Sequence, residues 1–242
     1  MSSAWTGSVS SPAGSSPDVG VVLVAAGTGV RAGPGEPKQF RPIVGVPMLL
    51  RALRPFTSHP AVAQVAVALP AGDAEHPPAW LPRLGGDRLI VVRGGEHRAL
   101  SVLAGLRALG AGCAVVLVHD AARPFVSRET IDAVIARARR GVGAVAAVPV
   151  SDTVKEVADG FRVTGTVSRD ALWRAQTPQG FPRAMLTSAY DRLGDPAAVT
   201  DDGEVCERAG FPVEVVPDTP HNFKVTTADD FRIAEALARE PR

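Results

Sequence analysis

The sequence predicts an α/β protein with a mostly parallel central sheet and one inserted β-arm. Short apolar runs of strand-forming residues alternate with segments of helical periodicity, which is typical of right-handed βαβ units. These runs are apolar on every face, as expected for strands that are covered on both sides. Only the stretch 151–176 departs from the alternation.

The first predicted strand, 21–24, runs into two alanines and a glycine-rich loop. This loop carries Gly27, Gly29 and Arg31 and closes with Pro37-Lys38-Gln39. Glycines let backbone N–H groups approach a ligand closely, and bare N–H groups with cations suit phosphate. The loop is therefore a candidate nucleotide site, although a purely structural glycine-rich turn explains it equally well when it is taken alone.

Two common nucleotide motifs do not fit the loop. GTGVRA matches the dinucleotide fingerprint G-x-G-x-x-A, which requires an immediate helix and an acidic residue about 20 residues later. Pro34, Gly35 and Pro37 keep the chain irregular, and residues 47–51 contain no acid. A P-loop is excluded because no G-K-[ST] follows. A dehydrogenase is therefore not favoured.

The following elements can be read in order from periodicity and breakers. Helices are expected at 46–58, 98–109 and 131–138, and strands at 65–69, 89–92, 113–118 and 143–148. The segment 71–86 is expected to be a surface connection with one short helix. In 151–176, strand-like pieces at 153–157 and 161–167 surround Asp159-Gly160, a hairpin signal. Such a hairpin is either exchanged with a second subunit or packed on its own domain.

The remaining C-terminal elements complete the domain. Helices are expected at 182–193 and 200–209, and strands at 213–216 and 222–225. Thr227 is expected to cap a last helix, with Asp230 in the position of a capping box. We expect one domain over 19–242, preceded by a disordered tail over 1–18 that is rich in Ser, Gly and Pro.

Composition excludes several classes of function. The net charge of +1 disfavours an extended nucleic-acid surface. The sequence contains no run of about 18 apolar residues, so no membrane span is predicted. The N-terminal segment lacks the features of a signal peptide. Cys113 and Cys206 are too few for a disulfide framework and are expected to be buried apolar residues. We expect a cytoplasmic protein.

Candidate ligand groups follow the ends of the predicted strands, where α/β sheets bind ligands. They are Gly94-Gly95-Glu96, Asp120 with Arg123, and Lys224, one of only three lysines. One carboxylate among several cations suits a magnesium–triphosphate complex, while a local ion pair is the alternative for Asp120 and Arg123. No nucleophile–base pair stands out. His119 is expected to be either a core residue or a residue that supports a site residue from behind, and not a general base. The inventory favours phosphoryl or nucleotidyl transfer.

The chain resembles the 2-C-methyl-D-erythritol 4-phosphate cytidylyltransferases of non-mevalonate isoprenoid biosynthesis. The resemblance extends over about 19–237 and rests on the order and spacing of eight segments. They are AAGTGVR (25–31), PKQ (37–39), GGEHRALSVLAGL (94–106), HDAARP (119–124), SDTVK (151–155), TVSRDALWRAQTPQ (166–179), TD (200–201) and NFKVT (222–226).

The resemblance implies a Rossmann-like nucleotidyltransferase fold whose arm, at about 151–176, builds a homodimer. It also implies CTP and methylerythritol phosphate as substrates, Mg²⁺ as cofactor and Asp120 as metal ligand. The catalytic residues implied are Arg31, Lys38, Arg169 and Lys224. The CTP-binding residues implied are Ala25, Ala26, Gly27, Gly29, Gly95, Glu96, Arg98 and Ser101. The residues implied to line the pocket for the second substrate are Asp120, Arg123, Thr200 and a partner-subunit Thr153.

Two departures from the family pattern and two rival functions stay open at this point. Gly203-Glu204 stands where a small residue and a serine are expected, and Leu100 occupies a position that is often polar. A cytidylyltransferase for another polyol phosphate, such as ribitol 5-phosphate, would share most of these motifs. A regulator that binds nucleotide without catalysis would have lost Arg31, Lys38 or Asp120, and all three are present.

Overall fold

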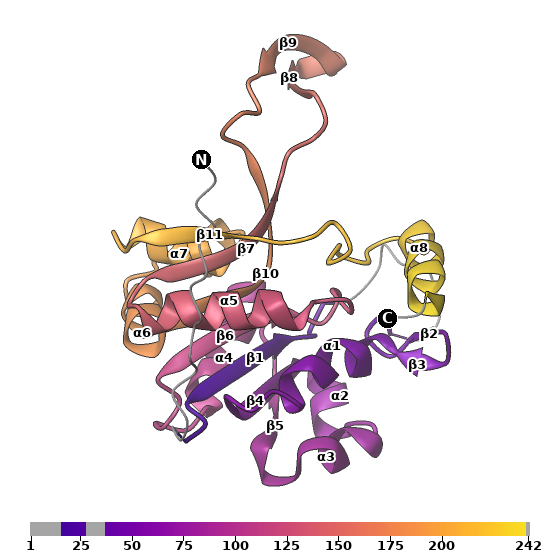
Figure 1. Cartoon of the computed structure of the whole chain (residues 1–242), viewed down its shortest axis with the longest axis vertical. Coiled ribbons are helices and arrows are strands. Elements are labelled where there is room, and N and C mark those ends of the chain that lie inside the picture. The colour runs from indigo at the N-terminus through magenta and orange to yellow at the C-terminus, as the bar shows by residue number, and fades with distance from the viewer. Residues whose placement is uncertain (1–15, 28–36, 241–242) are drawn as a thin grey trace, which may run out of the picture.

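A seven-stranded sheet forms the centre of the molecule (Figure 1). The computed structural model describes residues 16–27 and 37–240. The strand order is β11-β7-β10-β6-β1-β4-β5, and β10 alone runs antiparallel to its neighbours. The bounds are β1 Val19–Val24, β4 Val62–Leu69, β5 Leu89–Arg93, β6 Val115–Asp120, β7 Gly143–Pro149, β10 Trp173–Pro182 and β11 Val213–Pro217.

Helices cover both faces of this sheet, which explains why its central strands are apolar throughout. On one face α1 (Met48–Thr57) and α5 (Arg128–Arg139) pack against Val21 and Leu23 of β1. On the other face α4 (Arg98–Ala108), α6 (Arg183–Asp191) and α7 (Asp202–Arg208) enclose Val22. Successive side chains of β1 therefore enter two separate cores, as the pleat of a strand requires.

Smaller elements close the edges of this body. The C-terminal helix α8 (Ala228–Arg239) packs against a two-stranded ribbon of β2 (Pro42–Ile43) and β3 (Val46–Pro47) in a third apolar cluster. Thr227 and Asp230 form the predicted capping box of α8. Beyond β4 lie α2 (Ala71–Glu75), α3 (Trp80–Gly85) and the 3-10 turn η2 (Gly86–Arg88). A further 3-10 turn, η4 (Pro196–Ala198), follows α6 and contacts α4.

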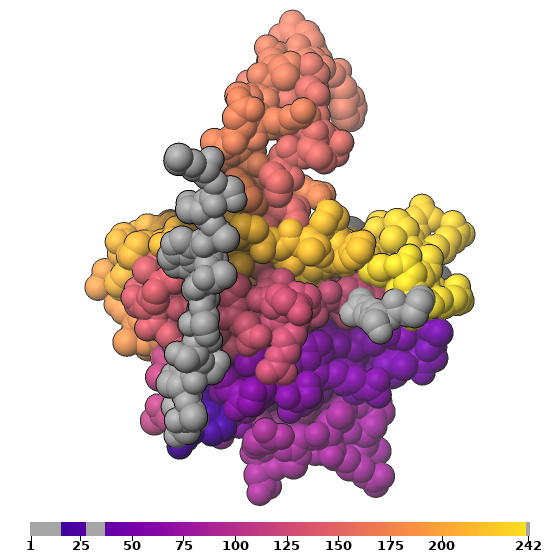
Figure 2. All heavy atoms as spheres, in the orientation of Figure 1, coloured from indigo at the N-terminus to yellow at the C-terminus, as the bar shows by residue number. Residues whose placement is uncertain are grey.

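The arm stands apart from the body (Figures 1 and 2). It consists of β8 (Val154–Ala158) and β9 (Arg162–Val167), joined by the turn η3 (Asp159–Phe161). Gly160 has a φ of +69°, which explains the Asp-Gly turn signal. Phe161 at the tip is 95% exposed. The predicted inserted hairpin is thus confirmed, and it does not pack on its own domain.

Some sequence-based expectations need correction. The range 151–176 includes the start of β10, which belongs to the central sheet and which periodicity missed because it reads WRAQTPQGFP, with two prolines and several polar residues. Residues 222–225 are not a strand, 46–47 are a strand and not a helix start, and 71–86 holds two helices.

Two further expectations concern the N-terminal tail and membrane spans. Residues 1–15 of the predicted tail lie outside the described residues, while Asp18 pairs with Arg139 at 2.5 Å. No helix among the described residues is long and apolar enough to cross a membrane.

Candidate active site

A pocket opens at the carboxyl end of β1, between the start of the glycine-rich loop and the N-terminus of α4. Most of the predicted nucleotide residues line it. The lining includes Ala25, Ala26, Gly27, Lys38, Gly95, Glu96, Arg98, Ser101, Asp120 and Lys224, together with Gln39, His97, Ala121 and Ala122. Gly29 and Arg31 lie outside the described residues. The predicted loop-and-strand-end site is therefore assembled as one cavity.

Close backbone approach shapes one wall of this pocket. A Cβ on Gly94 would lie 2.3 Å from the Cβ of Ala26 and 2.9 Å from the Oγ of Ser101. The Ser101 hydroxyl accepts the N–H of Gly95 at 3.1 Å. Only glycine at 94 lets the β5–α4 loop come this near to β1, so the loop and the strand end form one surface.

Asp120 is the electrostatic centre of the site. Its Oδ1 accepts the Nε–H of Arg98 at 3.1 Å, and its Oδ2 accepts the Nζ–H of Lys224 at 2.7 Å. Burial by itself raises the pKa of this carboxyl group, but the cations of Arg98 and Lys224 outweigh burial and hold the pKa well below its ordinary value. Asp120 is therefore a carboxylate across the physiological pH range.

A second pocket adjoins the first and shares three side chains with it. Arg98, Asp120 and Lys224 line both cavities, and the second also contains Arg123, Ala175, Gln176, Thr177, Gln179, Thr200 and Asp201. The guanidinium of Arg123 donates to the carbonyl oxygen of Asn222 at 2.7 Å. Two cation-rich cavities thus share one boundary. It is formed by the Asp120 carboxylate and the cations of Arg98 and Lys224, and we call it the shared wall.

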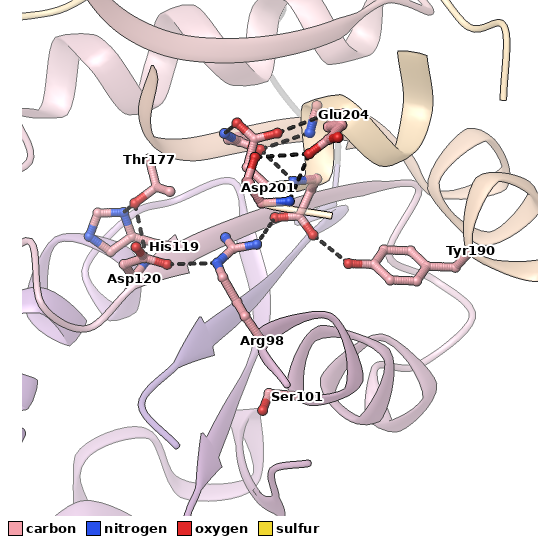
Figure 3. A network of polar contacts seen from close by, with 12 residues as sticks. Arg98, Ser101, His119, Asp120, Thr177, Tyr190, Asp201 and Glu204 are labelled. Carbon is pink, nitrogen blue, oxygen red and sulfur yellow. Dashed lines mark hydrogen bonds and ion pairs between the residues drawn. The ribbon is translucent and has the colours of Figure 1, made fainter. Parts of the chain in front are cut away.

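His119 lies beside Asp120 and Thr177, as Figure 3 shows. The backbone N–H of Asp120 donates to the Thr177 Oγ1 at 3.0 Å, and that hydroxyl lies 2.9 Å from the Nδ1 of His119. The His119 Nε2 lies 3.0 Å from the carbonyl oxygen of Arg123. Since a carbonyl only accepts, the proton sits on Nε2, and the Thr177 hydroxyl donates to Nδ1. Burial lowers the pKa of His119 to about 4, so the expected core role is confirmed.

Sequence reasoning missed the residues behind the wall. The Gln179 Oε1 accepts the backbone N–H groups of Asp202 and Gly203, and so fixes the start of α7 to β10. Asp202 accepts from Arg98 and from Tyr190. TPQ was part of the resemblance and Asp202 was seen near a helix start, but nothing in the sequence signals Tyr190.

Glu204, one of the departures from the family pattern, contacts a predicted substrate residue. Its Oε2 accepts both the backbone N–H of Thr200 at 2.7 Å and the Thr200 hydroxyl at 2.9 Å. These hydrogen bonds lower the pKa of Glu204. The Thr200 hydroxyl therefore donates its proton to Glu204. The lone pairs of the hydroxyl oxygen remain available to accept from donors in the pocket.

Two predicted residues do not reach either cavity of this chain. Thr153 and Arg169 lie at the base of the arm and are exposed. The Arg169 guanidinium donates to the carbonyl oxygen of Ser151, on the same arm. Lys38, by contrast, is held at the pocket by donating from Nζ to the carbonyl oxygen of Val225 at 2.8 Å.

This combination defines the class of the protein. A parallel sheet with a glycine-rich loop at its first strand end, two adjoining cation-rich cavities and a neutral, buried histidine suits transfer between phosphates. The protein is a nucleotidyltransferase.

Comparisons with known proteins identify the family. The family described as 2-C-methyl-D-erythritol 4-phosphate cytidylyltransferase matches residues 19–240. A protein of that name from Roseobacter denitrificans is 44% identical over 91% of this chain and 97% of its own length. The crystal structure of the enzyme so named from Thermus thermophilus superposes with a TM-score of 0.74 at 35% identity, covering 90% of this chain and 98% of that one. The chain belongs to the 2-C-methyl-D-erythritol 4-phosphate cytidylyltransferase family.

Other relatives are longer. The "Bifunctional enzyme IspD/IspF" of Desulfotalea psychrophila is 38% identical over 92% of this chain, which spans 57% of that protein. The resemblance read from the sequence is thereby confirmed at the level of family and fold.

Proposed function

We propose that the protein transfers CMP from CTP to 2-C-methyl-D-erythritol 4-phosphate, giving 4-diphosphocytidyl-2-C-methyl-D-erythritol and pyrophosphate. Family membership supports this reading, and nothing in the comparisons favours ribitol 5-phosphate. The observation that carries it is the wall of Arg98, Asp120 and Lys224, which two cavities share. One cavity takes the nucleotide and the other the alcohol phosphate, so their phosphates meet at this wall.

The chemistry requires charge neutralisation and no general base. A phosphate monoester oxygen is already an anionic nucleophile. It attacks the α-phosphorus of CTP, and the bond to the bridging oxygen of the β-phosphate breaks as pyrophosphate leaves. Cations that stabilise the charge developing in such a transition state contribute most of the catalysis. The neutral, buried His119 is consistent with this assignment because it offers no base to the pocket.

Residue roles follow from position. Lys38, held at the pocket, would stabilise the transition state at the α-phosphorus. The family resemblance assigns the same role to Arg31, which lies outside the described residues. Lys224 would hold the attacking phosphate, because its ammonium group, 2.7 Å from Asp120, faces both cavities. Arg123 and Thr200 would line the alcohol side. Ala25, Gly95 and Ser101 would surround the cytosine.

Mg²⁺ would bind at Asp120. No group of three His, Cys, Asp or Glu side chains suited to a metal occurs among residues 16–27 and 37–240. Mg²⁺ in nucleotide sites uses one or two carboxylates plus substrate phosphates, and Asp120 supplies one such carboxylate at the pocket. When bound, the ion would neutralise phosphate charge.

A homodimer would complete the site. Thr153 and Arg169 are exposed on an arm that projects from the body (Figure 1). Val157, Phe161 and Val163 of this arm are also more than half exposed, and contiguous apolar surface favours a protein partner. The arm of a second copy would bring Thr153 and Arg169 to the alcohol cavity. The two free, buried cysteines agree with a cytoplasmic location.

The test is pyrophosphate release with Mg²⁺, crossing CTP, ATP, GTP and UTP with methylerythritol phosphate and ribitol 5-phosphate. The proposal expects release only with CTP and methylerythritol phosphate. Release only with ribitol 5-phosphate would replace the alcohol substrate, and CTP binding without release for any pair would favour a regulator.

A further inference from the structure

A buried carboxylate lies behind the shared wall and lines neither of the two cavities. Asp202, in the first turn of α7, is fully buried. Its Oδ2 accepts the Nη1–H of Arg98 at 2.7 Å, and its Oδ1 accepts the hydroxyl of Tyr190 at 2.7 Å. Figure 3 shows Tyr190 directed at this point from the side opposite Asp120. Each oxygen of the Asp202 carboxylate therefore accepts one side-chain hydrogen bond.

Arg98 is the link between this carboxylate and the wall. Its Nη1 contacts Asp202 and its Nε contacts Asp120, while Asp120 holds Lys224. The charges alternate along the series from Asp202 to Lys224, so each ion is flanked by opposite charge. Burial alone lowers the pKa of Arg98, but the two carboxylates outweigh burial and raise it. The Nη2 of Arg98 has no partner among the described residues.

Stability is a poor explanation for such an arrangement. A buried ion pair loses much of its attraction to desolvation, and apolar replacements of similar volume are often neutral or stabilising. What a buried pair with a single geometry does provide is orientation. A guanidinium whose planar fork is fixed at both edges cannot rotate about its last torsions.

We propose that Asp202 and Tyr190 are positioning residues for nucleotidyl transfer: Tyr190 orients the Asp202 carboxylate, which fixes Arg98, which in turn places Asp120 and Lys224 at the wall between the two cavities. Neither residue touches substrate, since both lie behind Arg98. This inference rests on the proposed function, because it concerns the geometry in which the two phosphates meet.

Steady-state kinetics of pyrophosphate release test the inference. In Tyr190→Phe, which removes only the hydroxyl, kcat is expected to fall about tenfold, as for loss of one hydrogen bond to a charged group. In Asp202→Asn the fall is expected to be on the order of 10²-fold, the effect of displacing a catalytic group by about 1 Å. The dissociation constant of CTP is expected to change less than kcat in both variants, because Ala25, Gly95 and Ser101 are untouched and only the contact of Arg98 with the nucleotide is disturbed.

Two further measurements separate positioning from mere loss of stability. Ile135→Val removes one methylene from the buried side of α5, in the opposite core, and in denaturant titrations its loss of stability is expected to be comparable to that of Tyr190→Phe. Its kcat should remain that of the parent. In the double variant Tyr190→Phe/Asp202→Asn, kcat should equal that of Asp202→Asn alone, since Tyr190 acts only through Asp202.

Tyr190 is the chain's single tyrosine, so it also serves as a spectroscopic reporter. With 3-fluorotyrosine incorporated, the fluorine spectrum contains one resonance. Adding CTP and methylerythritol phosphate should shift it in the parent, and Arg98→Lys should abolish the shift.

The inference fails if Tyr190→Phe and Asp202→Asn retain the parent kcat, or if Ile135→Val loses as much activity as Tyr190→Phe. It also fails if the fluorine resonance does not shift when CTP and methylerythritol phosphate are added. Where Asp202→Asn does not fold, Tyr190→Phe and the fluorine shift decide. Failure of the proposed function is a different result: the parent itself would then release no pyrophosphate with these substrates.

Discussion

The wall of the two cavities and the arm hold their polar side chains in different ways. At the wall, Asp120 is 10% exposed at its side chain and has a fixed partner on each oxygen. On the arm, Thr153 and Arg169 are exposed. The fold of a single chain thus holds the first group in place, whereas the second would join the site only through a partner, as we propose. Preorganisation is the property that separates them.

The largest expected effect belongs to the preorganised half. Lys38→Ala should lower kcat on the order of 10²–10³-fold, as for the loss of one donor to a transition-state oxyanion. Turnover with saturating CTP and methylerythritol phosphate is the measurement. Arg232→Ala, which removes a cation that is 82% exposed on α8, is the matched control and should leave kcat unchanged. A Lys38→Ala enzyme with near-normal turnover would contradict the assignment.

The proposed role of the arm residue Arg169 is tested by mixing subunits that carry different substitutions. Arg169→Ala should lower kcat/KM on the order of 10²-fold. If the arm serves the partner's cavity, a mixed dimer of Arg169→Ala and Lys38→Ala subunits has one intact site. An equal mixture, refolded together, should then regain about one quarter of the parent activity, because half of the dimers are mixed and each has one of two sites. No recovery would show that each arm serves its own chain or that no dimer forms.

A pair of glycines compares the packing of the two regions. Gly94→Ala places a Cβ 2.3 Å from the Cβ of Ala26, so the β5–α4 loop must move. We expect a loss of about 1–3 kcal/mol in the free energy of unfolding, as for other overpacked sites, and a raised KM for CTP. In the arm, Gly165→Ala meets only the Glu156 Oε2 at 3.5 Å and should change neither. Equal tolerance at both positions, by denaturant titration, would argue against a tightly packed pocket wall.

The pH dependence of stability tests whether His119, next to the shared wall, is buried and neutral. Its pKa is about 4 in the folded protein against 6.5 for an ordinary histidine. Between these values the unfolded chain binds a proton that the folded chain does not, so stability is complete above about 6.5 and falls as the pH falls toward 4. The loss between pH 7 and pH 5 should be roughly 2 kcal/mol.

The control for this prediction is His119→Gln, which has no group that titrates in this window. The parent should lose roughly 2 kcal/mol more than the variant between pH 7 and pH 5 in denaturant titrations. Parallel pH profiles of the two proteins would contradict a neutral, buried His119.

The residues of the glycine-rich loop and the strand ends could be predicted from the sequence. Strand β1 is an apolar run that leads into the glycine-rich loop, and β6 is an apolar run that ends in His119-Asp120. Parallel strands present their carboxyl ends at one edge. Pattern and topology together therefore predicted one site for Gly27, Lys38, Gly95 and Asp120, and all four line one pocket. Strand β10 was not predicted, because its polar residues and two prolines hide the periodicity of a strand. Its Thr177 and Gln179 bond to His119 and to the start of α7 instead of to solvent.

The sequence by itself determined the alternating α/β order, the glycine-rich loop and the inserted hairpin, because these depend on local periodicity and turn chemistry. Only the tertiary structure decided that Arg98 bridges Asp120 and Asp202, that Tyr190 stands behind them, and that Thr153 and Arg169 stay outside the pocket. The contact of Arg98 with Asp202 joins residues 104 positions apart. Such contacts depend on how α4 and α7 pack on one face of the sheet, and no spacing along the chain records that packing.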